Sequence, residues 1–418
     1  MIPKTEILII GGGAIGVCCA FYLNAIGKDV LLVEKDDICS GSSYGNAGLI
    51  VPSHSMPLAA PGVIGQGLKW MFKPYSPFYI KPRFDRDFLA WLWQFRGACN
   101  IQHVRRSIPV LHDLHAASLG LFQDLANLDG LEFGLATKGM LELFNTRQGY
   151  DKGIKNIRLV EEFGIENMIV PPNEFAEFLD GIHTAAVGGA YLAHDAHIIP
   201  DRFVQQMAGY VEKKGVRLLT SCEVLDFETS GRHVSRVKTT RGDILAEEIV
   251  LAGGAWSIDL ARLLQFNLSM QAAKGYSITF RRPSQCPALP VILAESKVVL
   301  TPMDDMLRFA GTLELTGFDQ SVNLGRVRAI LDAVRAYFPD MDPASLELLE
   351  IWRGLRPCSP DGLPYIGRTP RFDNVIIATG HGMLGISLAP ITGKIISQLC
   401  NHDIPDFDMA TLSVERFH

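Results

Sequence analysis

The chain has 418 residues, of which 48% are hydrophobic and 20% are charged, a composition that excludes a disordered chain, a collagen-like repeat and a coiled coil. The 39 lysines and arginines against 45 aspartates and glutamates leave a net charge of −6, so the basic footprint typical of nucleic-acid-binding proteins is missing. The eight cysteines have no metal-ligand spacing. We expect them to be reduced thiols in the core of a cytoplasmic protein that has no metal site.

The chain begins with a predicted strand, a glycine-rich turn and a helix. Residues 6–10 (EILII) form a short apolar run typical of a buried parallel strand. GGGAIG follows at 11–16, and the apolar residues after it predict a helix that ends near Gly27. Three consecutive glycines interrupt this stretch and no basic region precedes it, so we do not expect residues 6–23 to be a signal peptide or a membrane span.

The glycines and an acid on the next strand together predict dinucleotide binding. Gly11 permits the tight turn, Gly13 lets the backbone approach a pyrophosphate, and Gly16 lets the helix pack closely on the strand. A second strand (DVLLVEK) ends at Glu34, whose carboxylate would accept hydrogen bonds from the ribose hydroxyls and would repel a 2′-phosphate. The alternative is a glycine-rich turn of an unrelated α/β protein.

Two further segments favour FAD over NAD. Residues 39–50 form a small, hydroxyl-rich loop, including Asn46, that offers donors to phosphate oxygens and to a ring edge. Residues 374–399 predict another apolar strand, a glycine-rich turn at 380–385 and a helix whose N-terminus would face an anionic group. A reduced flavin gathers negative charge at its N1–C2 carbonyl edge, whereas NAD has no use for this element. A purely structural C-terminal strand and helix is the alternative.

These segments resemble the D-amino acid oxidase family of FAD oxidoreductases, which includes glycine oxidase, sarcosine oxidase and the bacterial D-amino acid dehydrogenases. The resemblance covers nearly the whole chain. It rests on GGGAIG, on Glu34 and on residues 42–50, 188–200, 247–257, 352–367 and 378–390. The segments most similar to the D-amino acid dehydrogenase subgroup are residues 56–63, 68–82, 88–95, 274–280 and 308–319.

The resemblance implies a set of residues that contact FAD. They are Ala14, Ile15, Glu34, Lys35, Ser42, Ser43, Ala47, Gly48, Leu49, Val224, Gly382, Met383, Leu384, Gly385, Ile386 and Ser387. Arg356 matches the arginine that holds the substrate carboxylate in glycine oxidase, whereas Met383 replaces a second arginine of that enzyme. The cysteine that binds FAD covalently in sarcosine oxidases aligns with Gly354, and Cys358 is out of register, so non-covalent FAD is expected.

Oxidation of an amino acid at Cα requires a held carboxylate, a neutral amine and an α C–H bond that points at flavin N5. The planar fork of Arg356 suits the carboxylate, while Arg353 is the candidate for an internal ion pair. No strong general base is evident, so we expect direct hydride transfer once the amine is deprotonated. His381 would accept the ammonium proton, donate to a flavin oxygen or pack in its turn. His54 and Tyr276 are expected to line the substrate site.

The expected fold class is α/β with two domains. A Rossmann-like FAD-binding domain, discontinuous in sequence, would comprise residues 1–85, 196–265 and 350–418. A substrate-binding domain with an antiparallel sheet would comprise residues 86–195 and 266–349. Residues 67–95 interleave aromatic side chains with lysines and arginines, which fits a lid, a subunit contact or a peripheral contact with the inner face of the cell membrane.

The expected function is oxidative deamination of D-amino acids, with electrons passed to a quinone-type acceptor. One alternative is an oxidase or dehydrogenase of glycine, sarcosine or a D-imino acid such as D-hydroxyproline. The other is a flavin-binding subunit that acts as a scaffold or electron-transfer partner in a larger complex.

Overall fold

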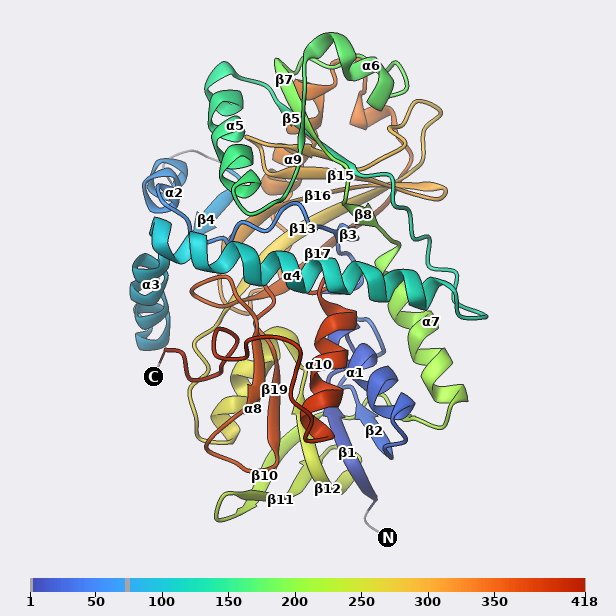
Figure 1. The fold of residues 1–418 in the computed structure, drawn as a ribbon, viewed down its shortest axis with the longest axis vertical. Helices are drawn as coiled ribbons and strands as arrows, with labels where there is room; N and C mark the ends of the chain where they lie inside the picture. The colour runs from blue at the N-terminus through green and yellow to red at the C-terminus, as the bar shows by residue number, and fades with distance from the viewer. Residues whose placement is uncertain (1–2, 72–75, 418) are drawn as a thin grey trace.

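The computed structural model describes residues 3–71 and 76–417. Two sheets lie in the two halves of the molecule, and the long helix α4 (Ile101–Ala126) crosses between them (Figure 1). A short two-stranded sheet joins β3 (Leu49–Ile50) to β8 (Ala196–His197). The predicted mixed α/β class with two halves is therefore confirmed.

The first sheet has parallel strands at its centre. The strand order is β10-β11-β12-β1-β2-β9, with β19 paired to β12 and β18 paired to β19. Every residue of β2 and β19 is buried, as expected for strands covered on both faces. The strands are β1 (Lys4–Ile10), β2 (Val30–Val33), β9 (Arg217–Leu219), β10 (Val224–Ser230), β11 (His233–Thr239), β12 (Gly242–Leu251), β18 (Tyr365–Arg368) and β19 (Val375–Thr379).

Helices cover both faces of this sheet. On one face, α1 (Ala14–Ala25), α7 (Pro200–Lys213) and α10 (Ala389–Cys400) pack in one apolar cluster with the C-terminal half of α4. On the other face, α8 (Ser257–Leu263) packs in a second cluster with the strands. The helices predicted after 11–16 and after 380–385 are thus both present on the same face.

The second sheet is mostly antiparallel. Its order is β17-β13-β16-β15-β14-β5-β7-β6, with β4 paired to β16. The strands are β4 (Phe78–Ile80), β5 (Met140–Phe144), β6 (Met168–Val170), β7 (Gly188–Leu192), β13 (Gln271–Arg281), β14 (Val291–Leu293), β15 (Val298–Met303), β16 (Met306–Leu315) and β17 (Leu348–Cys358). The remaining helices are α2 (Val63–Met71), α3 (Arg86–Ala98), α5 (Arg147–Glu161), α6 (Phe175–Phe178) and α9 (Leu324–Tyr337), with short 3₁₀ turns at Pro172–Glu174, Gly254–Trp256 and Pro343–Ser345.

The sheet membership differs from the expected domain boundaries at two places. β4 and β17 belong to the second sheet, although the boundaries at residues 85 and 350 put them with the FAD-binding segments. β17 pairs with β13 along almost its whole length, a choice of partner that strand propensity cannot specify. The division of the chain into two domains with those boundaries remains a prediction.

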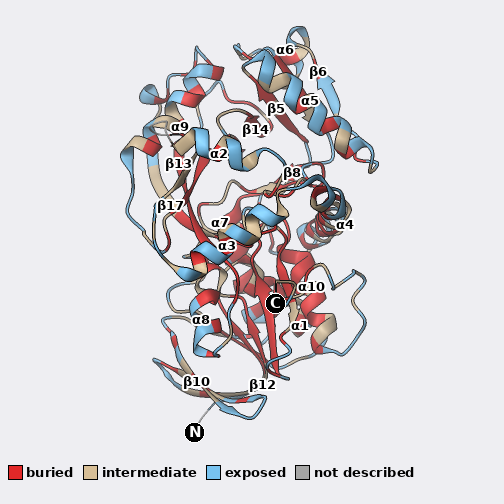
Figure 2. Cartoon of the chain, turned by 90° about the vertical axis from the view of Figure 1, so that its left-hand side faces the viewer, coloured by how far each residue is buried: buried red, intermediate tan, exposed pale blue. Residues whose placement is uncertain are grey.

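The aromatic segment 67–95 is partly buried and partly exposed (Figure 2). Phe88 and Trp91 of α3 are buried, and the Trp91 indole N–H donates to the Cys358 carbonyl oxygen at 2.9 Å. Phe84 and Trp93 are exposed. Residues 72–75 lie outside the described part of the chain. Within residues 3–71 and 76–417, no helix is long and apolar enough to cross a membrane.

Candidate active site

In the turn after β1, two glycines lie so close to neighbouring carbonyl oxygens that a side chain would not fit. Gly11 has a φ of +121°, and a Cβ at this position would lie 2.5 Å from the Ala252 carbonyl oxygen. A Cβ at Gly16 would lie 1.9 Å from the Gly11 carbonyl oxygen. Both positions therefore need glycine, as the spacing predicts, and α1 can begin at Ala14 directly beside the strand.

Glu34 and Ser43 complete this turn. The carboxylate of Glu34 follows β2 and accepts hydrogen bonds from the Gly12 N–H at 2.7 Å and the Asp36 N–H at 3.0 Å. The Ser43 hydroxyl accepts from the Ala14 N–H at 3.0 Å. A fixed carboxylate thus lies where the ribose of a dinucleotide binds, and a hydroxyl lies at the helix start, where its phosphates bind.

A cavity of about 2550 Å³ extends from this turn to the second sheet. It is more than twice as large as an ordinary ligand pocket of roughly 300–1,000 Å³. Of the expected site residues, only Gly16 and Gly48 do not border it, and a Cβ at Gly48 would lie 2.2 Å from the Ile198 carbonyl oxygen. The expected residues that border it are Gly11, Gly13, Ala14, Ile15, Glu34, Lys35, Ser42, Ser43, Asn46, Ala47, Leu49, His54, Val224, Tyr276, Arg356, His381 and residues 382–387.

The second glycine-rich turn is longer than predicted. α10 begins only at Ala389, after a series of turns, rather than directly behind residue 385. His381 is buried, and its Nε2 lies 3.0 Å from the Thr392 hydroxyl. Burial lowers the pKa of His381 to about 3. The ring is therefore neutral, and these contacts favour a packing role over that of a proton acceptor.

Arg356 borders the cavity from β17, and no acidic side chain within residues 3–71 and 76–417 pairs with it. Its Nη1 donates to the Thr312 carbonyl oxygen at 2.7 Å, and its guanidinium lies over Gly275, where a Cβ would be 2.1 Å from Nη1 and 2.3 Å from Cζ. No carboxylate of the described residues lies within 4 Å of it. Burial lowers the pKa of the guanidinium from its ordinary value, so an anionic ligand would compensate a desolvated charge.

Gly275 and Thr312 contact the Arg356 guanidinium, and the sequence analysis did not predict either contact. Thr312 has a φ of +67°, which a β-branched residue rarely adopts. The pairing of β13 with β16 shifts register between Lys274 and Tyr276, directly opposite. The irregular backbone directs the Thr312 carbonyl at Arg356. The one available signal is a glycine inside a strand pattern, which often marks a bulge or a close approach.

Two other arginines near the cavity have different partners. Arg353 donates from Nε to the Gln320 carbonyl oxygen at 2.8 Å, and among the described residues it has no ion pair, contrary to expectation. Arg308 is buried, and its Nη1 donates to the carbonyl oxygens of Tyr44 and Asn46 at 3.2 and 2.9 Å. Arg308 therefore links the hydroxyl-rich loop at residues 39–50 to the second sheet by hydrogen bonds.

Tyr276 and His54, the two residues expected to line the substrate site, differ in how far their polar groups are free to contact a ligand. The Tyr276 hydroxyl donates to Glu314 at 2.7 Å, and its ring packs in the apolar core of the second sheet. Tyr276 thus borders the cavity, but its hydroxyl already has a partner, and its place beside the substrate remains a prediction. His54 lies deep in the molecule, yet its side chain is exposed to the cavity. Burial is the largest effect on its pKa, which is lowered.

The loop that carries His54 is held from three sides. The Val51 N–H donates to the Ser387 hydroxyl at 3.1 Å, and His115 Nδ1 lies 2.6 Å from the same hydroxyl. The Ser53 N–H donates to the buried carboxylate of Asp195 at 2.8 Å. These hydrogen bonds anchor the segment from which His54 enters the cavity.

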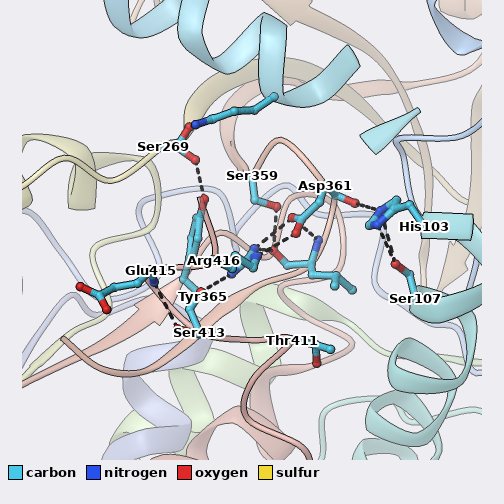
Figure 3. A network of polar contacts seen from close by, with 12 residues as sticks. His103, Ser107, Ser269, Ser359, Asp361, Tyr365, Thr411, Ser413, Glu415 and Arg416 are labelled. Carbon is cyan, nitrogen blue, oxygen red and sulfur yellow. Dashed lines mark hydrogen bonds and ion pairs between the residues drawn. The ribbon is translucent and has the colours of Figure 1, made fainter. Parts of the chain in front are cut away.

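The strand that carries Arg356 leads into a turn that a buried ion pair fixes (Figure 3). Arg416, near the C-terminus, donates from Nε and Nη2 to the two carboxylate oxygens of Asp361 at 2.7 and 3.0 Å. His103 Nε2 lies 2.9 Å from the Asp361 carbonyl oxygen, which ties α4 to the same turn. Asp361 is therefore structural.

The residues around the cavity fit FAD held without a covalent bond. The cavity joins a dinucleotide turn to a face of the second sheet where Gly275, Ala310 and Gly354 leave room for a ligand. Cys358 also borders the cavity, but burial raises the pKa of its thiol to about 11, so the thiol is not the reactive thiolate.

Comparisons with known proteins agree with this geometry. The family described as "FAD dependent oxidoreductase" (DAO) matches residues 6–399. A D-amino acid dehydrogenase of Vibrio atlanticus is 30% identical over 99% of this chain and 100% of the relative, and one of Granulibacter bethesdensis is 29% identical over 99% of each. The fold resembles glycine oxidase from Geobacillus kaustophilus, with a TM-score of 0.81 at 24% identity over the whole of both chains.

The predicted cofactor and enzyme class are confirmed by this match, which covers most of the chain. The cavity beside the dinucleotide turn has the lining that an FAD-binding protein needs, and the family match points to the same cofactor. The chain belongs to the DAO family of FAD-dependent oxidoreductases.

Proposed function

We propose that the protein oxidatively deaminates D-amino acids. The observation that carries this proposal is the guanidinium of Arg356, a half-buried cation without an acidic partner among the described residues, at the wall of the FAD cavity. The relatives named D-amino acid dehydrogenase, about 30% identical over nearly the full length, support the choice of substrate class.

In the proposed reaction, Arg356 holds the substrate carboxylate with a planar pair of N–H donors. Thr312 and Gly275 fix the guanidinium on one side, so its remaining N–H groups are available to the substrate. This fixed orientation would account for much of the rate, because a held carboxylate restricts where the α C–H bond can point. When bound, FAD supplies the two-electron oxidant that accepts hydride from Cα.

No side chain of the described cavity wall is needed as a strong base. With a pKa of about 3, His381 is too weak to take the proton of an ammonium group. The substrate amine instead loses its proton to water before oxidation. The imino acid that forms is then hydrolysed by water to the keto acid and ammonia.

The acceptor we propose is a membrane quinone. The apolar side chains of Phe84, Leu89 and Trp93 are exposed beside the basic Lys81 and Arg86, a combination that suits contact with an anionic bilayer. Phe84→Ser with Trp93→Ser should abolish co-sedimentation with phosphatidylglycerol-containing vesicles, whereas full retention would contradict the contact. Trp70 is a second candidate in this segment, and Phe72 lies outside the described residues.

The test of the function is anaerobic mixing of the purified FAD-bound protein with a panel of D-amino acids, glycine, sarcosine and D-hydroxyproline, with the flavin absorbance as readout. Bleaching by D-amino acids is expected. Bleaching only by glycine, sarcosine or the imino acid would favour the alternative substrates, and no bleaching would favour a scaffold subunit. Faster turnover with a quinone than with O₂ is expected, and rapid peroxide formation without a gain from quinone would make the protein an oxidase.

Arg356 has its own test in the same assay. Arg356→Lys keeps the charge but loses the paired geometry, and Arg356→Ala loses both. Loss of a charged hydrogen bond should lower kcat/KM for D-amino acids by roughly 30- to 1,000-fold, most in the alanine variant. The kcat/KM for amines that lack a carboxylate should hardly change in either variant. Full activity of the folded, FAD-bound alanine variant would remove Arg356 from the site.

A further inference from the structure

One cross-strand row on the cavity face of the second sheet ends in a carboxylate. Ala310 pairs with Val299, Val299 with Ile292, and Ile292 with Glu142. Residues paired in this way share one face of a sheet, and all four border the cavity. Three small or aliphatic side chains therefore lead along the cavity wall to one acid.

The Glu142 carboxylate has no hydrogen-bond donor or cation as a partner in the part of the chain that the structure describes. Strand alternation turns it away from Leu141 and Leu143, which are fully buried in the core on the opposite face. Its side chain is half-buried, and among the described residues it forms neither a hydrogen bond nor an ion pair. Met140 and Ile292 beside it belong to an apolar cluster. A carboxylate in such surroundings gains when a cation binds it.

No group around Glu142 within the described residues occupies the place of a cation that a bound ligand would bring. His54 is near enough for the Glu142 charge to raise its pKa, although burial, the larger effect, leaves that pKa lowered. His54 therefore adds a neutral hydrogen-bonding ring to the same part of the cavity. Lys297, Lys152 and Lys155 also border the cavity, but none lies within 4 Å of the Glu142 carboxylate.

The spacing between Arg356 and Glu142 suits a long substrate. The Arg356 guanidinium contacts Thr312 on β16, and Glu142 lies three strands further along the sheet, on β5. At about 4.8 Å per strand, this separation is about 14 Å. An extended arginine separates its carboxylate from its guanidinium by about 7 Å, and a hydrogen-bonded contact at each end adds about 3.5 Å. Together these distances make about 14 Å, which matches the separation of the two protein groups.

We propose that Glu142 binds the cationic end of the substrate, so that the preferred substrates are basic D-amino acids with a guanidinium or ammonium group. This inference rests on the proposed function and adds the substrate class. The carboxylate end would be held by Arg356 and the cationic end by Glu142, with the aliphatic stem along Ala310, Val299 and Ile292.

The test compares D-arginine and D-lysine with D-norleucine, which has a similar length without the charge. In Glu142→Gln, the ratio of kcat/KM for D-arginine over that for D-norleucine should fall roughly 10- to 100-fold. Glu162→Gln is the matched control, because Glu162 borders the same cavity but already pairs with Arg105 at 2.8 Å. Equal effects on both substrates, or no change in the ratio, would overturn the proposal.

A binding measurement separates this inference from the proposed function. 5-Guanidinopentanoate lacks the amine and cannot be oxidised, and its Kd can be followed by the change in flavin absorbance. Glu142→Gln should weaken this ligand at least tenfold and leave hexanoate within twofold. If no D-amino acid bleaches the flavin, the proposed function fails, while the two Kd values still decide whether Glu142 binds a cation. Equal weakening of the binding of both ligands would refute the proposal that Glu142 binds a cation.

Discussion

Gly275→Ala tests the proposed carboxylate clamp, the guanidinium of Arg356 held by Thr312 over Gly275, without altering any charge. The added Cβ would lie 2.1 Å from Arg356 Nη1 and 2.3 Å from Cζ. Ordinary contact begins at 3.4 Å, so the guanidinium must move by about 1.3 Å. The end of a flexible side chain can make this shift, so the fold should tolerate the variant. A misplacement of about 1 Å at a substrate-positioning group costs on the order of 10²-fold in rate.

The assay is anaerobic reduction of the FAD-bound variant by D-amino acids, with a thermal melt to check folding. We expect kcat/KM to fall about 100-fold while FAD stays bound and the melting temperature changes little. Gly65→Ala is the control, since Gly65 also borders the cavity but a Cβ there would meet no atom within 4 Å. Wild-type kcat/KM in the folded Gly275→Ala protein would refute the clamp geometry.

Three further predictions concern the cofactor turn, the C-terminal turn and pH. Glu34→Arg should weaken FAD binding, because a cation would replace the carboxylate at the ribose position, and an unchanged Kd for FAD would show that Glu34 only ends its strand. Asp361→Asn should lower the free energy of unfolding by about 3–5 kcal/mol, since the Arg416 charge would stay buried without its partner, and a urea melt like that of the wild type would contradict this. Burial raises the pKa of Asp195 from 3.8 to about 7, so between these values the folded state binds more protons than the unfolded state and stability falls as pH rises. Asp195→Asn should remove that decline between pH 4 and 7, and an unchanged slope of the melting temperature would show that another group causes it.

The local elements of the first sheet follow from the sequence. The apolar run at 6–10, the glycines at 11–16 and Glu34 are consecutive, and their contacts form within about 25 residues of chain. Their chemistry is local, because a tight turn needs a positive φ and a helix start binds phosphate wherever it occurs. These segments predict dinucleotide binding, and together with residues 39–50, 374–399 and the further family motifs they predicted the family and the FAD cofactor correctly.

The part of the cavity formed by the second sheet was decided by tertiary structure. The sequence singles out Arg356 but says nothing of Gly275 and Thr312, which contact it from neighbouring strands only because β17 pairs with β13 and β13 with β16. Tyr276 borders the cavity, as expected, but only the register shows that its hydroxyl donates to Glu314. Glu142 becomes part of the cavity through a row of pairings that spans four strands. Strand order and register arise from the packing of whole sheets, so no local pattern in the sequence contains them.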